Sequence, residues 1–330
     1  MCSLSSFSLR WFVALVALAT TLQAQPPREI RRQPGFPPRF HDPSTPVKEG
    51  DQWYVFSTGN GIQTRTSKDL TTWEEGPPVF KEMPKWHQEV VPTQRGHLWA
   101  PDIITHQGVH RLYYSVSSFG KNVSAIGLVT NRSLDPAHPD FKWKDEGIVI
   151  RSARNDPWNA IDPHVIVDDN GRHWMSFGSF WSGIQLIELD PATGKLLEEP
   201  AKLRQIAWNK TIEAPAILKQ GDFYYLFVNW GLCCRGLDST YEIRIGRSKS
   251  ITGPYLDKQG ADLATGGGTL LLGARNKHLG PGHASFITDK EGVRMFYHFY
   301  DRNRGGYSTI SSHRLQWTED GWPEIPETKK

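Results

Sequence analysis

One pattern recurs five times along the chain: a short polar or acidic segment, a strand, a turn, and then an aromatic strand that ends in small residues. The copies begin near positions 41, 100, 162, 213 and 282. Each contains a turn of the kind that hairpins require, such as Asp169-Asn170-Gly171, followed by the aromatic and β-branched residues typical of strands. Repeats of this length, built from three or four antiparallel strands, are typical of propeller blades.

The repeat therefore predicts an all-β protein, a five-bladed β-propeller. No long segment has the i, i+3, i+4, i+7 spacing of apolar residues that indicates an amphipathic helix. A β-sandwich is the alternative fold, but it does not account for the fivefold recurrence. We expect a single propeller over residues 41–330, without a second folded domain, and a monomer.

The N-terminus has the features of a secretory signal peptide. Arg10 precedes a short apolar run from Trp11 to Ala19, and Leu22-Gln23-Ala24 resembles a cleavage site. The run is too short to span a membrane. We expect removal of residues 1–24, a secreted protein in the extracellular or periplasmic space, and an extended Pro/Arg-rich lead-in over residues 25–40. A disordered leader on a cytoplasmic protein is the alternative.

The net charge and the aromatic content of the chain indicate which kinds of ligand it can bind. The formal net charge of +3 over 330 residues is too small to indicate binding to nucleic acid or to a membrane surface. Thirteen Trp, ten Tyr and fifteen Phe suit a β-rich protein that stacks against sugar rings, although propeller cores also use aromatic residues.

Loss of the leader would leave Cys233 and Cys234 as the remaining cysteines. Adjacent cysteines cannot join distant loops, and their spacing is not that of a zinc site. We expect two buried thiols, with a strained vicinal disulfide as the alternative.

The propeller geometry predicts where polar side chains meet. The innermost strand of each blade lines the central channel, so equivalent positions of different blades converge. Five such positions fall at the start of the first strand of each repeat: Asp42, Asp102, Asp162, Glu213 and His283. Like charge and desolvation raise the pKa of some clustered carboxyls, which leaves a protonated acid beside ionised bases.

That combination is the one that glycoside hydrolysis requires, and a wide separation across the channel favours an inverting mechanism. The structural alternative is that such residues accept hydrogen bonds from backbone N–H groups in turns, and Asp102 is the best candidate for that role.

Several short motifs occur in a fixed order along the repeats: His41-Asp42-Pro43, Leu98-Trp99-Ala100-Pro101-Asp102, YYSVSSFGKNVSAIGL from Tyr113, Asn159-Ala160-Ile161-Asp162-Pro163, FGSFWSGI from Phe177, Ile212-Glu213-Ala214-Pro215 and NWGLCCRGLDSTYEIRIGRS from Asn229. Their order and spacing resemble those of the endo-arabinanases of glycoside hydrolase family 43. These are five-bladed propellers that cut α-1,5-linked L-arabinan. The similarity runs from about His41 to the C-terminus.

The resemblance implies an endo-acting, inverting hydrolase of arabinan and assigns roles to its carboxyls. Asp42 would be the general base that activates water, Glu213 the general acid, and Asp162 the third carboxylate, which orients the acid and raises its pKa.

The resemblance also implies contacts to substrate and metal. Sugar contacts are expected at Trp99, Phe119, Asn159, Ser179, Trp181 and Arg235. His283 in Gly-Pro-Gly-His would hold a calcium ion together with water. Because calcium prefers oxygen ligands, a channel histidine bonded only to water is the alternative.

Three other functions remain open. An exo-acting α-L-arabinofuranosidase or β-xylosidase would keep the fold and change the substrate or the bond cut. A non-catalytic sugar-binding propeller would lack the acid or the base, and a protein-interaction propeller would need no inward carboxylates. Sequons at Asn122, Asn131 and Asn209 are possible glycan sites in a secreted eukaryotic protein.

Overall fold

The structure, a computed structural model, describes residues 38–326. The expected signal peptide (1–24) and nearly all of the expected lead-in (25–40) lie outside the described residues. Pro37–Lys330 cluster as one unit.

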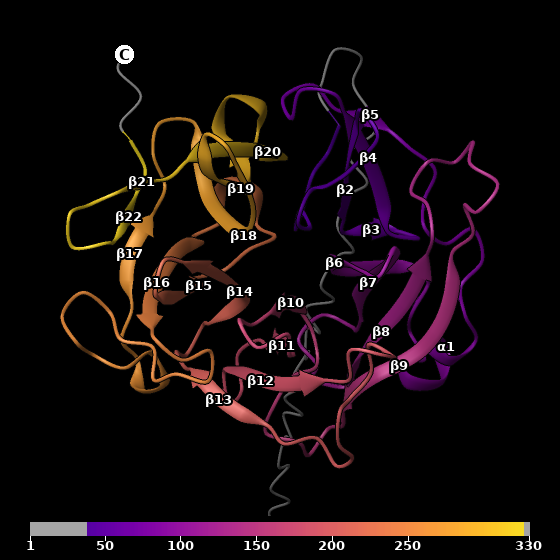
Figure 1. Cartoon of the computed structure of the whole chain (residues 1–330), viewed down its shortest axis with the longest axis horizontal. Coiled ribbons are helices and arrows are strands. Elements are labelled where there is room, and N and C mark those ends of the chain that lie inside the picture. The colour runs from indigo at the N-terminus through magenta and orange to yellow at the C-terminus, as the bar shows by residue number, and fades with distance from the viewer. Residues whose placement is uncertain (1–37, 327–330) are drawn as a thin grey trace, which may run out of the picture. The chain divides into compact units, whose positions relative to one another are not determined.

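The described residues form five antiparallel sheets around one axis (Figure 1), which confirms the all-β, five-bladed propeller. Blade 1 contains β1 (Val47–Glu49), β2 (Gln52–Ser57), β4 (Gln63–Ser67) and β5 (Glu74–Glu75). Blade 2 contains β6 (His97–His106), β7 (Val109–Val116), β8 (Ser124–Asn131) and β9 (Lys144–Ser152), with the short β3 (Gly59–Asn60) paired to β6.

The remaining blades follow in chain order. Blade 3 contains β10 (His164–Val167), β11 (His173–Phe177), β12 (Ile184–Leu189) and β13 (Arg204–Ala207). Blade 4 contains β14 (Glu213–Gln220), β15 (Phe223–Trp230), β16 (Glu242–Ser248) and β17 (Thr269–Leu272). Blade 5 has three strands, β18 (His278–Asp289), β19 (Gly292–Asp301) and β20 (Tyr307–Arg314), followed by the hairpin of β21 (Gln316–Trp317) and β22 (Pro323–Glu324).

Helices are few, as the sequence predicts. Over residues 38–326 there is one short α-helix, α1 (Trp86–Val90), with 3₁₀ turns η1 (Gly236–Asp238), η2 (Leu263–Thr265) and η3 (Arg302–Arg304). No helix in this part of the chain has the length and apolar character needed to cross a membrane.

The apolar core lies between neighbouring blades. Each of the five interfaces has its own cluster of buried residues, such as Phe227 of blade 4 against Phe286 of blade 5, whose ring centroids are 4.5 Å apart. Full burial of one such side chain stabilises the fold by about 1.5–3 kcal/mol. Each blade packs against a neighbouring blade on both of its faces. Successive side chains of a strand point to opposite faces, so aromatic and β-branched residues along the strands fill both interfaces.

Blades 1 and 5 close the ring through packing and through the segment that precedes β1. Phe40 is buried with Trp73 of blade 1 and Phe296 of blade 5. The Phe40 backbone N–H donates to the Ser308 carbonyl of β20 at 3.3 Å, and Arg39 Nε donates to the Ser308 hydroxyl at 3.1 Å.

One non-glycine residue with positive φ lies within each innermost strand or in the segment just before it. These residues are Asp42 (φ 53°), Ala100 (45°), Asp162 (59°), Ala214 (52°) and His283 (58°). Their positions correct the repeat register expected from the sequence. Asp102 lies two residues beyond the blade 2 equivalent, and Glu213 lies one residue before the blade 4 equivalent.

A ring of hydrogen bonds joins each of these residues to a neighbouring blade. The backbone N–H of each donates to a side chain near the end of the second strand of the preceding blade in four cases: Ala100 to Thr58 Oγ1 (2.8 Å), Asp162 to Ser115 Oγ (2.9 Å), His283 to Asn229 Oδ1 (2.9 Å) and Asp42 to His298 Nδ1 (3.1 Å). The last of these bonds runs from blade 1 to blade 5 and completes the circle.

Blade 4 is the exception. The corresponding residue of blade 3 is Gly178, which has no side chain to offer, and a Cβ there would lie 2.3 Å from the Gly183 carbonyl oxygen. The Ala214 N–H donates instead to Asp162 Oδ2 at 3.1 Å. The carboxylate of Asp162 therefore serves as the hydrogen-bond acceptor that the side chain at this position provides in the other blades.

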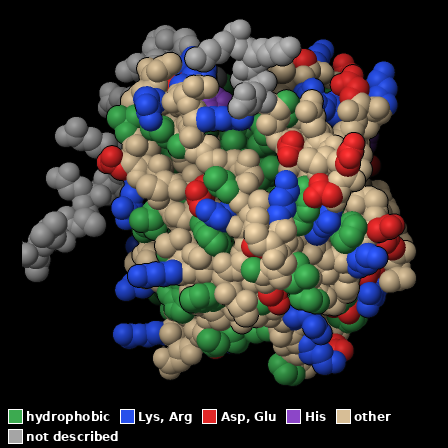
Figure 2. Space-filling model, turned by 90° about the vertical axis from the view of Figure 1, so that its left-hand side faces the viewer, with side chains coloured by type: hydrophobic (Ala, Val, Ile, Leu, Met, Phe, Trp, Pro, Cys, Tyr) green, Lys and Arg blue, Asp and Glu red, His purple; other side chains and the backbone are tan. Residues whose placement is uncertain are grey.

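The side face that includes β17, β21 and β22 carries interspersed basic and acidic side chains (Figure 2). This mixture agrees with the small net charge of the chain. A nucleic-acid site would show a stripe of one sign on the face that it uses, and this face shows none.

The hydrogen-bond ring predicts a stability difference between two substitutions of Thr58. Thr58→Val keeps the shape but leaves the buried Ala100 N–H without its acceptor, so we expect a loss of about 1–3 kcal/mol in the free energy of unfolding. Thr58→Ser retains the hydroxyl and serves as the control. Urea unfolding measures both variants, and equal stability of the two would show that this bond does not support the fold.

Candidate active site

The structure brings the three predicted catalytic carboxyls together near the propeller axis. Asp42, Asp162 and Glu213 come from blades 1, 3 and 4, and their exposed fractions are only 9, 8 and 8%. The charge of Asp42 acts on both Asp162 and Glu213, and the charge of Asp162 acts on Glu213. Buried carboxyls in one cluster cannot all ionise normally, so their individual surroundings decide their protonation.

Asp42 is surrounded by hydrogen-bond donors and imidazoles. Its Oδ2 accepts from Thr58 Oγ1 at 2.5 Å and lies 2.8 Å from His41 Nδ1. Its Oδ1 lies 3.5 Å from Nδ1 of both His283 and His298. Burial opposes ionisation of Asp42, but His41, followed by His283, outweighs burial and holds the pKa of Asp42 far below its ordinary value.

His41 is the cationic partner of Asp42. Its Nε2 lies 2.7 Å from the Tyr300 hydroxyl and 3.7 Å from Cys234 Sγ. Burial alone would lower the pKa of His41, but the charges of Asp42 and Cys234 hold it well above the ordinary value. His298, which stacks on His41 at 4.1 Å, has a pKa well below normal because of burial and then the His41 charge, so its Nδ1 is free to accept the Asp42 N–H.

The pKa values of Glu213 and Asp162 shift upwards, in the opposite direction to that of Asp42. Burial, reinforced by the charge of Asp162, raises the pKa of Glu213 well above its ordinary value. Ser179 Oγ donates to Glu213 Oε2 at 2.8 Å, which partly opposes that rise. Burial and the charge of Asp42 likewise raise the pKa of Asp162. The cluster therefore holds one carboxylate that ionises readily, Asp42, beside a pair of carboxyls, Asp162 and Glu213, that do not both ionise readily.

Asp102 has the structural role that the sequence left open. Its Oδ1 accepts from the Thr45 N–H of blade 1 at 3.0 Å, and its Oδ2 accepts from the Val165 N–H of blade 3 at 3.1 Å. Asp102 thus joins three blades and is not free for chemistry.

His283 lies in the cluster, as predicted, and it is buried. Within the described residues, the groups of three or more His, Cys, Asp or Glu ligand atoms that could hold an ion do not include His283. The predicted ion would therefore be held by His283 and by water, although calcium prefers several oxygen ligands. The calcium ion at His283 stays a prediction that rests on the resemblance alone.

The predicted sugar contacts divide into two groups. Phe119, Trp181 and Arg235 are exposed, and Phe119 lies edge-on to the half-buried Trp99 with ring centroids 6.3 Å apart. These four side chains are accessible to a ligand.

Asn159 and Ser179 are buried, in contrast to the expectation of direct sugar contact. Asn159 Oδ1 accepts from Ser124 Oγ at 2.8 Å, and the Ser179 hydroxyl is directed to Glu213. Both side chains support the site from within because their polar groups bond to protein partners.

Cys233 and Cys234 differ from the expected pair of buried thiols. Both are free thiols, Cys233 is half-buried and Cys234 is exposed. They lie in the loop after β15, which turns towards His41, so their environment is part of the active site rather than of the blade core. At the sequon of Asn122, the side-chain nitrogen donates to three backbone carbonyls, which leaves no room for a glycan.

Four residues around Asp42 were not singled out from the sequence: His41, Thr58, His298 and Tyr300. His41 was visible as a neighbour of Asp42 in the His-Asp-Pro motif. Thr58 lies just after β2 and belongs to none of the motifs. His298 and Tyr300 are far away in sequence, and only the ring closure between blades 1 and 5 brings them to Asp42 and His41.

A buried set of carboxyls whose pKa values shift in opposite directions is the arrangement that glycoside hydrolysis requires. The chain belongs to glycoside hydrolase family 43, whose family model matches residues 32–323. Within the family, the chain is 47% identical over 300 residues to an extracellular exo-α-(1→5)-L-arabinofuranosidase of Cellvibrio japonicus. That alignment covers 87% of this chain and 86% of the relative.

Two further relatives agree with this assignment. An extracellular endo-α-(1→5)-L-arabinanase of Bacillus subtilis is 42% identical over 292 residues, which cover 86% of this chain and 87% of the relative. The solved structure of a Cellvibrio cellulosa α-L-arabinanase complexed with arabinohexaose superposes with a TM-score of 0.84 at 45% identity. It covers 88% of this chain and 96% of that chain.

Proposed function

We propose that this protein hydrolyses α-1,5-linked L-arabinan with inversion of configuration. The observation that carries the proposal is that one buried cluster holds Asp42 and Glu213 in different surroundings, which shift the pKa of Asp42 down and that of Glu213 up. A base that stays ionised and an acid that keeps its proton are the two groups needed for inverting glycoside hydrolysis. The names of the relatives in Cellvibrio and Bacillus support arabinan as the polymer.

In this mechanism Asp42 accepts a proton from water as the water attacks the anomeric carbon. His41, bonded to Asp42 Oδ2 through Nδ1, keeps the carboxylate ionised and oriented. Glu213 donates its proton to the departing glycosidic oxygen. Asp162 is fixed by its bond from the Ala214 N–H, and its charge favours the protonated form of Glu213.

We further propose that cleavage is internal, as expected for an endo-arabinanase. The exposed Phe119 and Trp181, on blades 2 and 3, offer stacking surfaces for more than one sugar. Exo action is the second candidate because the relative from Cellvibrio japonicus is named as an exo enzyme. Secretion is also part of the proposal and rests on the N-terminal sequence and on the relatives being named extracellular.

The first test is substitution of each proposed catalytic carboxyl. Asp42→Asn, Asp162→Asn and Glu213→Gln should each lower kcat on debranched arabinan by about 10²–10⁴-fold, the usual contribution of acid–base catalysis. Asp222→Asn, in the exposed turn between β14 and β15, is the matched control and should be unaffected. A variant that keeps near-normal kcat would remove its residue from the mechanism.

The second test uses the raised pKa of Glu213. A general acid must be protonated, so activity should fall as pH rises through this pKa. The Ser179 hydroxyl stabilises the ionised form of Glu213, so Ser179→Ala should raise the pKa further and move the alkaline limb of kcat/KM to higher pH. Ser250→Ala, at an exposed turn, is the control. An unmoved limb in Ser179→Ala would mean that another group is the acid.

Product analysis on linear, debranched α-1,5-arabinan distinguishes the two modes of cleavage. Mixed short arabino-oligosaccharides at early times are expected for endo action, whereas arabinose alone would establish exo action. Xylan is incubated in parallel. Release of xylose from it, without cleavage of arabinan, would contradict the proposed substrate.

A further inference from the structure

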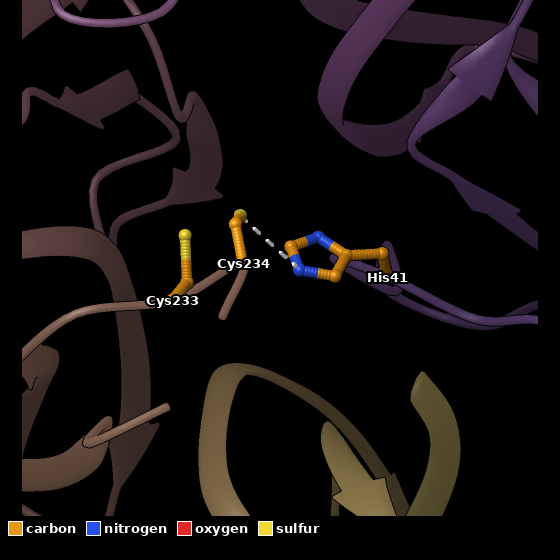
Figure 3. Close-up of side chains that lie close together, drawn as sticks. All are labelled: His41, Cys233 and Cys234. Atoms are coloured by element: carbon orange, nitrogen blue, oxygen red, sulfur yellow. Dashed lines mark hydrogen bonds between the residues drawn. The ribbon is translucent and has the colours of Figure 1, made fainter. Parts of the chain in front are cut away.

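Beside the proposed catalytic base lies a group of three side chains that can bind a metal, and two of them, both cysteines, have no part in the proposed hydrolysis. His41, Cys233 and Cys234 each offer one ligand atom, and these atoms all lie within 4.8 Å of one another. Figure 3 shows the Cys234 thiol directed towards the imidazole of His41, with the Cys233 side chain beside it. His41 comes from the segment before β1 and the cysteines from the loop after β15, so the propeller fold assembles the group.

We propose that His41, Cys233 and Cys234 form a binding site for one thiophilic divalent cation of the Zn²⁺ or Cd²⁺ type. This site is separate from the calcium expected at His283, since calcium prefers oxygen ligands. It does not depend on the proposed substrate.

The spacing suits a tetrahedral ion. Zinc bonds of about 2.3 Å to sulfur and about 2.0–2.1 Å to nitrogen place the two ligand atoms about 3.6 Å apart in a tetrahedron. The observed distance from Cys234 Sγ to His41 Nε2 is 3.7 Å. Three protein ligands would leave a fourth position for water, as in open zinc sites.

The surroundings already have the form that metal-binding histidines require. Such a histidine usually donates its second ring N–H to a carboxylate, which fixes the tautomer and the ring orientation. His41 Nδ1 lies 2.8 Å from Asp42 Oδ2, which leaves Nε2 directed towards Cys234. Binding would require the Tyr300 hydroxyl, 2.7 Å from Nε2, to give up its bond to His41 and keep the one from the Cys234 N–H.

An ion can also reach the site from solvent, because Cys234 is exposed. The ligands are thiolates, so binding of the ion would release the thiol protons.

Titration of Cd²⁺ into the full chain, followed by the ultraviolet thiolate-to-cadmium absorption band, tests the site. A Cys2→Ser background makes Cys233 and Cys234 the only thiols, and a phosphine reductant keeps both reduced. We expect one Cd²⁺ per chain. The band should be lost in the Cys233→Ser/Cys234→Ser double variant and unchanged in His138→Gln, a matched control at an exposed histidine.

Two variants separate this site from ordinary binding of metal to thiols. His41→Gln should weaken Cd²⁺ binding at least tenfold, and Asp42→Asn by about 10–100-fold, because the carboxylate orients the ligating imidazole. If both variants bound Cd²⁺ as tightly as the unsubstituted residues do, the two thiols would be acting without His41 and the proposed site would be wrong.

X-ray absorption of the Zn²⁺-loaded unsubstituted chain gives a test that no folding defect can affect. Two sulfur neighbours at about 2.3 Å with nitrogen or oxygen at about 2.0–2.1 Å are expected. A zinc shell of nitrogen and oxygen alone, or absence of stoichiometric binding in the reduced protein, would overturn the proposal.

Discussion

The active site depends on the left-handed residue that lies in, or just before, the innermost strand of each blade. A non-glycine residue with positive φ costs of order 1–3 kcal/mol, so five of them require compensation from their surroundings. That compensation comes from the N–H of each residue, which is bonded to a side chain of a neighbouring blade, and from the apolar clusters between blades. The turn directs Asp42, Asp162 and His283 towards the axis, and Glu213 follows because it adjoins Ala214.

The hydrogen bonds from these left-handed residues also involve side chains of the active site. Asp162 accepts the Ala214 N–H where Gly178 has no side chain, and its charge raises the pKa of its neighbour Glu213. His298 accepts the Asp42 N–H and stacks on His41, the cation that keeps Asp42 ionised. Buried carboxylates are costly unless they are paired and hydrogen-bonded. Here the side chains that accept hydrogen bonds between blades, His298 and Asp162, also contact or act on the groups that shift the pKa values of Asp42 and Glu213.

Much of this arrangement was predictable from the sequence because the repeat is strong. Five hairpins with aromatic strands indicated the propeller, and the acidic residues in Asp-Pro and Glu-Ala-Pro motifs indicated the cluster. The register of Asp102 was not predictable from residue type, since the position equivalent to Asp42 in blade 2 is occupied by Ala100. A local signal existed: in four blades the positive-φ residue precedes a proline, as in Ala100-Pro101.

Other features could not be inferred because they depend on which blades meet. On blade 5, His298 bonds to Asp42 and Tyr300 bonds to His41. Both lie more than two hundred positions away from these partners along the chain, and no local pattern marks them. The inward roles of Asn159 and Ser179 follow from their burial, which the motif alone does not give. The proximity of Cys233 and Cys234 to His41 likewise arises only when the loop after β15 reaches blade 1. Cysteine spacing in the sequence therefore gave no indication of a metal site.

The stereochemistry of hydrolysis tests this arrangement most directly. Proton NMR of an arabino-oligosaccharide reaction, recorded before mutarotation, identifies the anomer that forms first. Asp42 as general base and Glu213 as general acid predict that an α-linked substrate yields the β-anomer. Initial release of the α-anomer would mean retention through a covalent intermediate, which requires a carboxylate acting as nucleophile about 5–5.5 Å from the acid and contradicts the roles given to these two residues.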